Sequence, residues 1–505
     1  MSFPVHIVGG GLAGSECAWQ LAERGVSVVL HEMRPVRGTP AHKTGDLAEL
    51  VCSNSLRSDD PFHAAGLLKR EMEAFGSLII AKAREASVPA GSALALDRDR
   101  FAALVTAAIG RHPRIELRRE EATEIPAGEE TEVVLATGPL TSEAMSARLQ
   151  ELLGSAYLYF YDAIAPIVEA ESLDLSKLFW QSRYGKGEGE DYLNAPMDGE
   201  RYLAFHQAVT AAEVVAPHEF EKAVFFEGCL PIEELARRGV DTLRYGPMKP
   251  VGLRAPDGRR PWAVVQLRQE NLAKSQFNLV GFQSRMKWGE QDRVLRMIPG
   301  LENARFVRYG QIHRNTFVNA PTHLDKQYRV KTAPRVRLAG QITGVEGYLE
   351  SAATGLAIGL YISQERQGRN PEPFPATTAL GALARHLTES DPRHFQPANI
   401  NYGLFTELEG RVRRGDRRAA YVERAHADLA AWAERNGVFF ASERPHPRTL
   451  TPVPSPAPSH PPTPGEGDPV EAICFSPSSP GAGGWEGAGE EGRGDEGPTA
   501  REPEN

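Results

Sequence analysis

The sequence contains little cysteine and no long apolar run. Its 505 residues include only four cysteines, at positions 17, 52, 229 and 474, too few and too scattered for a disulfide scaffold. No stretch of about 18 uninterrupted apolar residues occurs, so no membrane span is predicted. The N-terminus has no basic region of the kind that begins a signal peptide. These absences predict a cytoplasmic protein in which a functional cysteine does chemistry.

The net charge of −9 is concentrated near the C-terminus. Residues 451–505 hold 10 acidic and 2 basic residues, which leaves 56 acidic and 55 basic residues in 1–450. A nearly neutral body neither favours nor excludes a nucleic-acid partner. The same segment contains 12 Pro and 10 Gly, a composition that cannot bury a core. The sequence therefore predicts a disordered, acidic tail over 445–505.

A glycine-rich motif follows the first apolar strand. Gly9-Gly10-Gly11-Leu12-Ala13-Gly14 satisfies G-x-G-x-x-G between a strand at 5–8 and a helix at 12–24. Such glycines permit a tight turn, a close approach to a pyrophosphate and close helix packing. A second strand at 26–30 leads to Glu32, placed to accept ribose hydroxyls. The motif predicts a Rossmann-type dinucleotide site, against the alternative of a glycine turn without a ligand.

Two later strands also run into glycine. Residues 133–136 lead to Gly138, and residues 336–339 lead to Gly340 and Gln341. Both junctions resemble those of flavoprotein disulfide-reductase-like chains, which favours FAD over NAD as the bound dinucleotide. Three such junctions predict an α/β, glutathione-reductase-like FAD-binding domain that an insertion interrupts.

The predicted domains follow from these junctions. The FAD-binding domain is expected at 1–160 and 330–365, and a mixed α+β insertion or substrate domain at 161–329. A helical C-terminal region is expected at 366–444, with helices at 380–387, 402–408 and 419–436. No metal site is predicted.

Two cysteines stand in unusual surroundings. Cys52 precedes a polar cluster, Ser53-Asn54-Ser55, and Cys229 lies between Gly228 and Pro231. Each setting could expose or activate a thiol, although an isolated cysteine is more often buried and inert. Cys17 is expected in a helix core, and Cys474 has no assigned role.

A series of motifs resembles one family. In chain order these are GGGLAGSE, ELVCSNSLRSDD, ALALDRDRF, FFEGCLPIEELA, YGPMKPVGL, QLRQEN, GFQSRMKWGEQ, HRNTF, GQITGVEGYLESAATG and FQPANINYGL. Together they resemble the folate- and FAD-dependent tRNA (uracil-5-)-methyltransferases over about residues 4–440. The glucose-inhibited-division-type flavoproteins, which modify the tRNA wobble uridine, share the fold and the GQITG segment but are less similar around both cysteines. The tail after 445 has no counterpart in the family.

The resemblance implies a reaction and its cofactors. The family forms 5-methyluridine at position 54 in the T loop of tRNA, with carbon from 5,10-methylenetetrahydrofolate and reducing equivalents from NADPH or NADH through FAD. Carried over, Cys52 and Cys229 are the two catalytic thiols, with their individual roles open. His313 would stack on the folate pterin, and Tyr348 would lie against the flavin ring.

Other interpretations remain at this point. A dithiol oxidoreductase would need its cysteines closer together than Cys52 and Cys229, and a non-catalytic RNA-binding flavoprotein would leave both inert. Arginines 411, 413, 414, 417 and 418 are candidates for tRNA phosphate contacts or form an ordinary solvated face. Lys249, Arg285 and Lys287 are further phosphate candidates.

Overall fold

The computed structural model describes residues 3–126, 128, 131–154, 158–215 and 230–443, with the backbone alone at 158–162 and 312–314. Cys229, Cys474 and the predicted tail over 445–505 lie outside the described residues. No helix among the described residues is long and apolar enough to cross a membrane.

Strands from both ends of the described chain form one six-stranded sheet in the order β16-β17-β7-β1-β2-β6. These strands are β1 (Val5–Val8), β2 (Val28–His31), β6 (Ile115–Arg118), β7 (Val133–Leu135), β16 (Arg329–Val330) and β17 (Ala333–Leu338). All neighbours run parallel except β16 and β17. The predicted α/β class with a parallel sheet is confirmed. Because β1, β7 and β17 are parallel neighbours, the three predicted glycine junctions meet at one edge.

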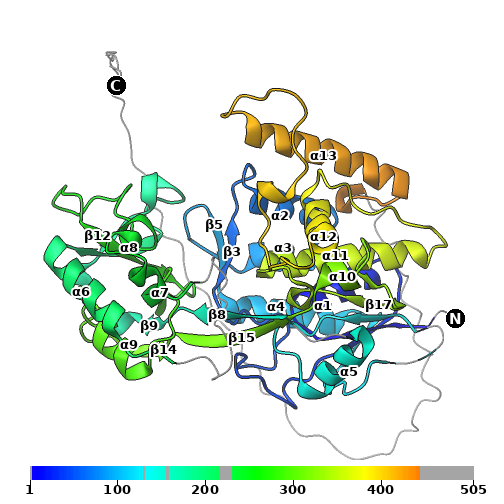
Figure 1. Ribbon diagram of the computed structural model, residues 1–505, viewed down its shortest axis with the longest axis horizontal. Helices are drawn as coiled ribbons and strands as arrows, with labels where there is room; N and C mark the ends of the chain where they lie inside the picture. Colours follow the sequence, from blue (N-terminus) through cyan, green and yellow to red (C-terminus); the bar gives the residue numbers. More distant parts are fainter. Residues whose placement is uncertain (1–2, 127, 129–130, 155–157, 216–229, 444–505) are drawn as a thin grey trace, which may run out of the picture. The chain divides into compact units, whose positions relative to one another are not determined.

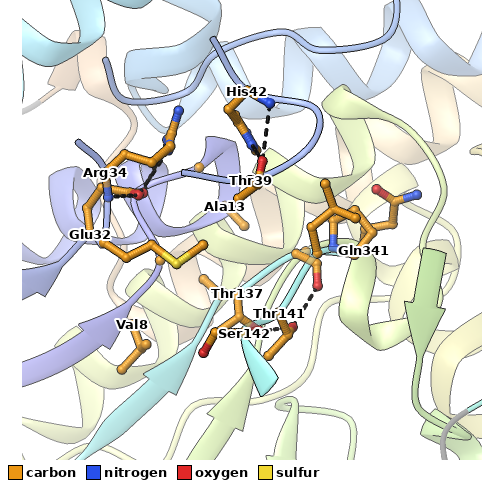
Figure 2. Close-up of a pocket in the computed structure, with 18 of the residues that line it drawn as sticks. Val8, Ala13, Glu32, Arg34, Thr39, His42, Thr137, Thr141, Ser142 and Gln341 are labelled. Carbon is orange, nitrogen blue, oxygen red and sulfur yellow. Dashed lines mark hydrogen bonds and ion pairs between the residues drawn. The ribbon is translucent and has the colours of Figure 1, made fainter. Parts of the chain in front are cut away.

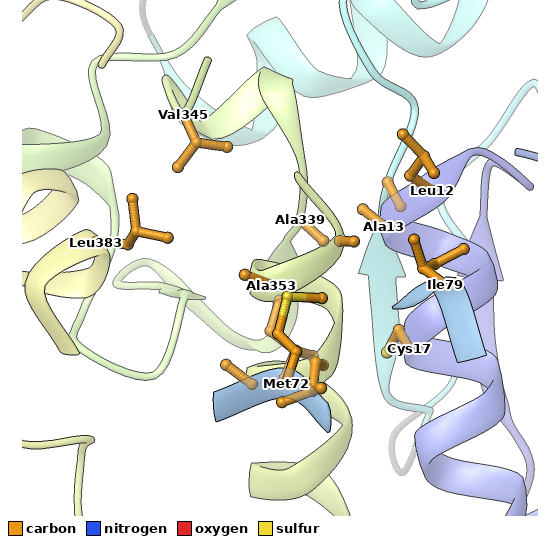
Figure 3. Packing of buried hydrophobic residues seen from close by; sticks show 14 of the residues in the cluster. Leu12, Ala13, Cys17, Met72, Ile79, Ala339, Val345, Ala353 and Leu383 are labelled. Atoms are coloured by element: carbon orange, nitrogen blue, oxygen red, sulfur yellow. The ribbon is translucent and has the colours of Figure 1, made fainter. Parts of the chain in front are cut away.

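Two long helices pack tightly beside this sheet. Helix α1 (Leu12–Ala22) contacts α11 (Tyr348–Glu365) through two glycines of α11. A Cβ on Gly355 would lie 2.0 Å from the carbonyl oxygen of Ala13, and one on Gly359 would lie 2.6 Å from Cβ of Gln20. Only glycine permits this approach, which encloses Cys17 completely, as predicted (Figure 3). Helix α1 ends at Ala22, two residues before the end predicted for it at Arg24.

Further helices surround the same core. They are α2 (Ala64–Ala74), α3 (Leu78–Glu85), α4 (Arg98–Arg111) and α5 (Glu143–Leu153). A small antiparallel sheet, β3-β5-β4, is formed by β3 (Ser55–Ser58), β4 (Ser87–Val88) and β5 (Ala93–Leu96). Strand β3 begins three residues after Cys52 and so anchors the cysteine loop on one side.

The middle of the chain forms a second sheet with its own core. Its order is β10-β11-β12-β13-β9-β14, and the pairs are antiparallel. The strands are β9 (Ile167–Glu169), β10 (Phe179–Trp180), β11 (Tyr192–Met197), β12 (Ala263–Gln269), β13 (Gln276–Leu279) and β14 (Phe306–Arg308). The helices are α6 (Gly199–Ala211), α7 (Ile232–Arg237), α8 (Thr242–Tyr245) and α9 (Trp288–Leu295). This mixed structure occupies the range in which the insertion was predicted.

A two-stranded ribbon carries the chain into and out of this middle region. Strand β8 (Leu158–Ile164) pairs antiparallel with β15 (Gln311–Phe317), and Figure 1 shows the ribbon running between the two sheets. The chain therefore enters and leaves the middle region through the same pair of strands.

The C-terminal helices share the core of the parallel sheet rather than forming their own. They are α10 (Ala320–His323), α12 (Ala379–Glu389) and α13 (Arg417–Asn436). The predicted helix at 402–408 is wrong, because only Tyr402–Leu404 forms one 3₁₀ turn. Phe405 leaves the turn in an extended conformation and is buried against Tyr421 of α13. Burial of that aromatic ring stabilises the fold more than continuation of the helix would.

Candidate active site

Two glycines of the turn have no room for a side chain, whereas a third has free space at its Cβ position. Gly9 has φ of 106°, and a Cβ there would lie 2.4 Å from the carbonyl oxygen of Ala136. A Cβ on Gly14 would lie 1.8 Å from the carbonyl oxygen of Gly9. A Cβ on Gly11 would meet nothing within 4 Å. Gly11 begins α1 without a side-chain cap, so the first N–H groups of the helix are available to an anion.

A cavity lies at the shared edge of β1, β7 and β17 (Figure 2). Its lining includes nine residues that the sequence predicted for cofactor binding: Gly9, Gly11, Leu12, Ala13, Glu32, Gly138, Gly340, Gln341 and Tyr348. Gly10 and Gly14 do not line it. Gly10 instead donates its N–H to Oε2 of Glu32 at 2.9 Å, and Gly14 sits where α1 crosses the turn.

Glu32 is more constrained than the sequence suggested. Its carboxylate accepts the Gly10 N–H and three N–H groups of Arg34, at 2.9 to 3.2 Å. Burial raises the pKa of Glu32, but the Arg34 contacts and the Gly10 N–H outweigh burial and leave the pKa lowered. The ion pair therefore holds an ionised acceptor at the end of β2.

Sequence reasoning missed two further residues of this cavity. Arg34 bridges Glu32 and Glu49, with 3.2 Å between its Nη1 and Oε2 of Glu49. His42 lies 2.6 Å from the hydroxyl of Thr39 (Figure 2). Burial and the Arg34 charge lower the pKa of His42 to about 4, so its imidazole is neutral near pH 7. The only sequence signal for Arg34 was its position two residues after the acid.

A second cavity adjoins the first and contains Cys52. The two cavities share five lining residues: Val51, Pro139, Leu140, Gln341 and Tyr348. Polar side chains of the second cavity include those of Arg57, Gln283, Asn315, Glu346 and Asn399. The geometry thus joins a dinucleotide cavity to a polar chamber with a thiol.

Tyr348 lies at the junction. Its hydroxyl oxygen accepts the backbone N–H of Cys52 at 2.5 Å and that of Ser53 at 3.2 Å. Burial, together with Cys52, raises the pKa of Tyr348, so the phenol is neutral. The residue predicted to contact flavin therefore also fixes the cysteine loop.

Arg57 also lines the Cys52 chamber. Its backbone has φ of 65°, an uncommon conformation for a residue other than glycine. Its Nη1 lies 2.6 Å from Oε1 of Glu350, whose side chain is fully buried. Strain of this kind is often retained at functional sites.

Three predicted residues have different outcomes. Cys17 is buried between α1 and α11, and burial raises the pKa of its thiol. The backbone of His313 lies in β15, but its side chain is outside the described residues. Cys229 is also outside them, although Ile232, three residues later, donates its N–H to the carbonyl oxygen of Gln283 at 2.7 Å. Gln283 lines the Cys52 chamber.

The five arginines at 411–418 are exposed, and none forms an ion pair with a described residue. Arg414, Arg417 and Arg418 line a depression with the stacked rings of Tyr402 and Tyr421. We call these five arginines the arginine cluster.

The other phosphate candidates differ from the arginine cluster. Arg285 pairs with Glu233 and Glu234, and Lys287 lies 2.7 Å from Glu213. Lys249 is exposed. The pairing weakens Arg285 and Lys287 as phosphate ligands.

Sequence comparison identifies a family and several relatives. The family described as glucose inhibited division protein A matches residues 4–370. A Geobacter sulfurreducens protein named methylenetetrahydrofolate–tRNA-(uracil-5-)-methyltransferase TrmFO is 58% identical over 433 residues, covering 86% of this chain and 99% of the relative. A Bacillus licheniformis protein of the same name is 54% identical over 427 residues, covering 84% and 98%.

Structural comparison agrees on the fold. Aquifex aeolicus GidA in its form II crystal has a TM-score of 0.63 at 16% identity, with 87% of this chain and 75% of that chain covered. The form I crystal gives a TM-score of 0.63 at 17% identity, with 88% and 77% covered.

Proposed function

The chain belongs to the glucose inhibited division protein A family, and we propose that within it the chain is a folate- and FAD-dependent tRNA (uracil-5-)-methyltransferase. It transfers a one-carbon unit from 5,10-methylenetetrahydrofolate to C5 of a tRNA uridine. The observation that carries this function is the junction at Tyr348, where the dinucleotide cavity meets the chamber of Cys52. Relatives of this name share 53% to 58% identity with most of the chain.

The dinucleotide cavity fits FAD. The open position at Gly11 and the uncapped start of α1 suit the pyrophosphate. Glu32, held by Arg34, suits the ribose. Gly340 lines this cavity, and Gln341 lines both cavities beside Tyr348, which would contact the ring. When bound, FAD and the folate supply the one-carbon and hydride chemistry that amino-acid side chains cannot provide.

The protein's own contribution begins with thiols. C5 of uracil is a poor nucleophile until a thiolate adds to C6, and removal of the C5 proton then requires a base. Cys52 and Cys229 are the two groups assigned to these steps. Cys229 precedes Ile232 by three positions, at most about 11 Å of chain, and the N–H of Ile232 is bonded to the carbonyl oxygen of Gln283, which lines the Cys52 chamber.

His313 and Tyr348 are proposed to position the folate and the flavin. Tyr348 lines both cavities, so its ring can close one side of the flavin. His313 belongs to β15, in which Asn315 lines the Cys52 chamber. NADPH or NADH is proposed as the reductant.

The partner is tRNA, and we propose the T loop with position 54 as the target, in the cytoplasm. The target uridine is stacked in the folded tRNA, so the enzyme must extract it. The arginine cluster supports phosphate binding because its guanidinium groups have no carboxylate partners among the described residues.

A nucleoside analysis tests this function. Transfer RNA from a deletion strain should lack 5-methyluridine, and the purified protein with methylenetetrahydrofolate and NADPH should restore it. With 5-fluorouracil-containing tRNA the protein should become covalently attached to the RNA. A dithiol oxidoreductase would trap no RNA, a wobble-uridine enzyme would leave 5-methyluridine present in the deletion strain, and a non-catalytic RNA-binding protein would neither trap RNA nor oxidise NADPH.

A further inference from the structure

A short loop brings Thr39 and His42 to the dinucleotide cavity, and both residues line it. Figure 2 shows the pair between Glu32 and Gln341, next to Ala13 in the first turn of α1. The first N–H groups of that helix have no side-chain cap and suit an anion. The loop therefore reaches the part of the cavity that suits the pyrophosphate of a dinucleotide.

The chain directly after this pair is anchored by hydrogen bonds of the protein itself. The carboxylate of Glu49 accepts the backbone N–H groups of Lys43 at 2.8 Å and Thr44 at 3.0 Å, together with the Thr44 hydroxyl at 2.8 Å. Burial raises the pKa of Glu49, but these hydrogen bonds outweigh burial and leave the pKa lowered. Nη1 of Arg119 donates to the carbonyl oxygen of Gly45 at 2.6 Å. The loop is therefore a fixed wall of the cavity.

The hydrogen bonds of Thr39 assign the tautomer of His42. Oγ1 of Thr39 accepts the backbone N–H of Ala41 at 3.3 Å and that of His42 at 3.1 Å. These two bonds occupy the acceptor positions of the hydroxyl, so its hydrogen is directed to Nδ1 of His42, 2.6 Å away. A neutral imidazole that accepts at Nδ1 carries its proton on Nε2. That N–H forms no hydrogen bond with any residue that the structure describes, which leaves it available to a ligand.

The surroundings of His42 favour its neutral form. Burial and the Arg34 charge lower its pKa to about 4, whereas Glu49 and Glu32 act in the opposite direction. Both carboxylates are themselves paired with Arg34, at 3.2 Å and 3.0 Å. A protonated imidazole would also need an acceptor for a hydrogen on Nδ1, which the Thr39 hydroxyl does not offer once its two acceptor positions are filled. The imidazole is therefore a neutral hydrogen-bond donor near pH 7.

We propose that His42 is a cofactor-binding residue that donates the N–H of Nε2 to the pyrophosphate of FAD, and that Thr39 is a positioning residue that directs this donor into the cavity. Phosphate oxygens are anionic acceptors, and a hydrogen bond from a neutral N–H to an anion is stronger than one between neutral groups. The pyrophosphate is then bound by the start of α1 and by the loop at 39–42. This inference rests on the proposed function for its use of FAD.

The test measures the dissociation constant of FAD from the full-length holoprotein, through the flavin fluorescence that appears on dilution. His42→Ala should raise this constant about tenfold or more, the loss expected for a hydrogen bond to a charged group. His42→Gln places an amide N–H near the position of Nε2 and should stay within about threefold of the parent protein. ADP carries the pyrophosphate without the flavin. Its inhibition constant, measured by displacement of FAD, should rise in His42→Ala by a similar factor.

Two further comparisons test the tautomer. Thr39→Val removes the hydroxyl and should raise the dissociation constant about threefold or more, whereas Thr39→Ser keeps the hydroxyl and should match the parent protein. The ratio of the constants for His42→Gln and the parent should not change between pH 6 and pH 8.5, because both donors are neutral. An imidazolium would instead weaken parent binding as the pH rises through about 6.5. His31 lines the same cavity but occurs in both proteins, so its titration cancels from the ratio.

His394→Ala is the matched control, because His394 is 80% exposed, contacts Asp391 and does not line the cavity, so the dissociation constant should not change. Melting temperatures identify variants that do not fold; if His42→Ala is one of them, the pH ratio and the two Thr39 variants still decide the result. The proposal is overturned by an unchanged constant in His42→Ala, by a His42→Gln protein as weak as His42→Ala, by a loss with FAD but not with ADP, or by a ratio that changes with pH. FAD release needs neither tRNA nor folate, so failure here would reject only this inference, and failure to methylate tRNA would reject only the proposed function.

Discussion

The hydroxyl oxygen of Tyr348 accepts the backbone N–H of Cys52 at 2.5 Å, although 296 positions separate the two residues in the chain. Tyr348 begins α11, and Cys52 lies in the loop before β3. One side chain therefore links the wall of the dinucleotide cavity to the thiol chamber. A change at this hydroxyl should affect the cysteine loop without removing the ring that faces both cavities.

Tyr348→Phe tests that separation. The N–H groups of Cys52 and Ser53 would lose their acceptor, which costs about 1–3 kcal/mol for buried donors. We expect a lower melting temperature and methylation reduced about tenfold or more, with FAD retained. Thermal unfolding, flavin absorbance and tRNA methylation check it. Unchanged stability would show that the hydroxyl is not a structural acceptor.

Gly11→Val should remove FAD while leaving the fold. A side chain at this position meets no protein atom within 4 Å, but it would enter the space that suits a pyrophosphate. The purified variant should be colourless with a cooperative unfolding transition. Gly14→Ala is the contrasting variant, because its Cβ would lie 1.8 Å from the carbonyl oxygen of Gly9, and it should fail to fold stably. A yellow Gly11→Val protein with full flavin content would contradict the assignment.

Cys52→Ala and Cys229→Ala should each lose methylation by two or more powers of ten, because a nucleophile or proton-transfer group is removed. Both should keep FAD and nearly normal melting temperatures. Cys17→Ala is the internal control: its thiol is buried in the helix core, so we expect destabilisation of about 1 kcal/mol with turnover retained. Wild-type turnover from both of the first two variants would remove the thiol mechanism.

Replacing Arg411, Arg413 and Arg414 together by Gln should weaken tRNA binding and flatten its salt dependence. The log–log slope should fall by about one unit for each phosphate group that the variant no longer neutralises. Filter binding at several salt concentrations measures it, with Arg293→Gln, at an exposed ion pair on α9, as a control for the loss of a surface charge elsewhere. An unaltered slope would identify the cluster as an ordinary solvated surface.

The buried amine of Lys69 should make the stability of the protein depend on pH. Its side chain is fully buried, its Nζ donates to the carbonyl oxygen of Ser58 at 2.7 Å, and burial lowers its pKa to about 8. Between pH 8 and the ordinary lysine value of about 10.4, the unfolded chain binds more protons, so stability due to this group rises with pH. The destabilising charge is fully present below pH 8.

Lys69→Met should remove this dependence. The free energy of unfolding of the variant should exceed that of the parent protein by more at pH 7 than at pH 10. The reason is that only the parent gains stability when Lys69 loses its proton. Urea unfolding at the two pH values measures the difference between the proteins. Parallel stability curves for variant and parent would show that Lys69 does not titrate in this range.

Local patterns in the sequence were sufficient for much of the nucleotide site. The glycine spacing after β1 predicted a strand–turn–helix unit because each glycine has a local steric reason, and Glu32 follows at the end of the next strand. Helix α13 was predicted nearly to its limits, since its apolar periodicity is strong. The helix expected at 402–408 failed because burial of Phe405 against Tyr421 is a tertiary preference that local propensity does not contain.

The sequence by itself determined the fold class and the glycine turn, because these depend on local sterics and on residue types at short spacing. Only the tertiary structure decided that Tyr348 holds the Cys52 loop and that the chamber of Cys52 adjoins the dinucleotide cavity. Those contacts join residues whose separation in the chain carries no periodic signal. They form because parallel strands bring distant loops to one edge of a sheet, where buried backbone N–H groups must find acceptors.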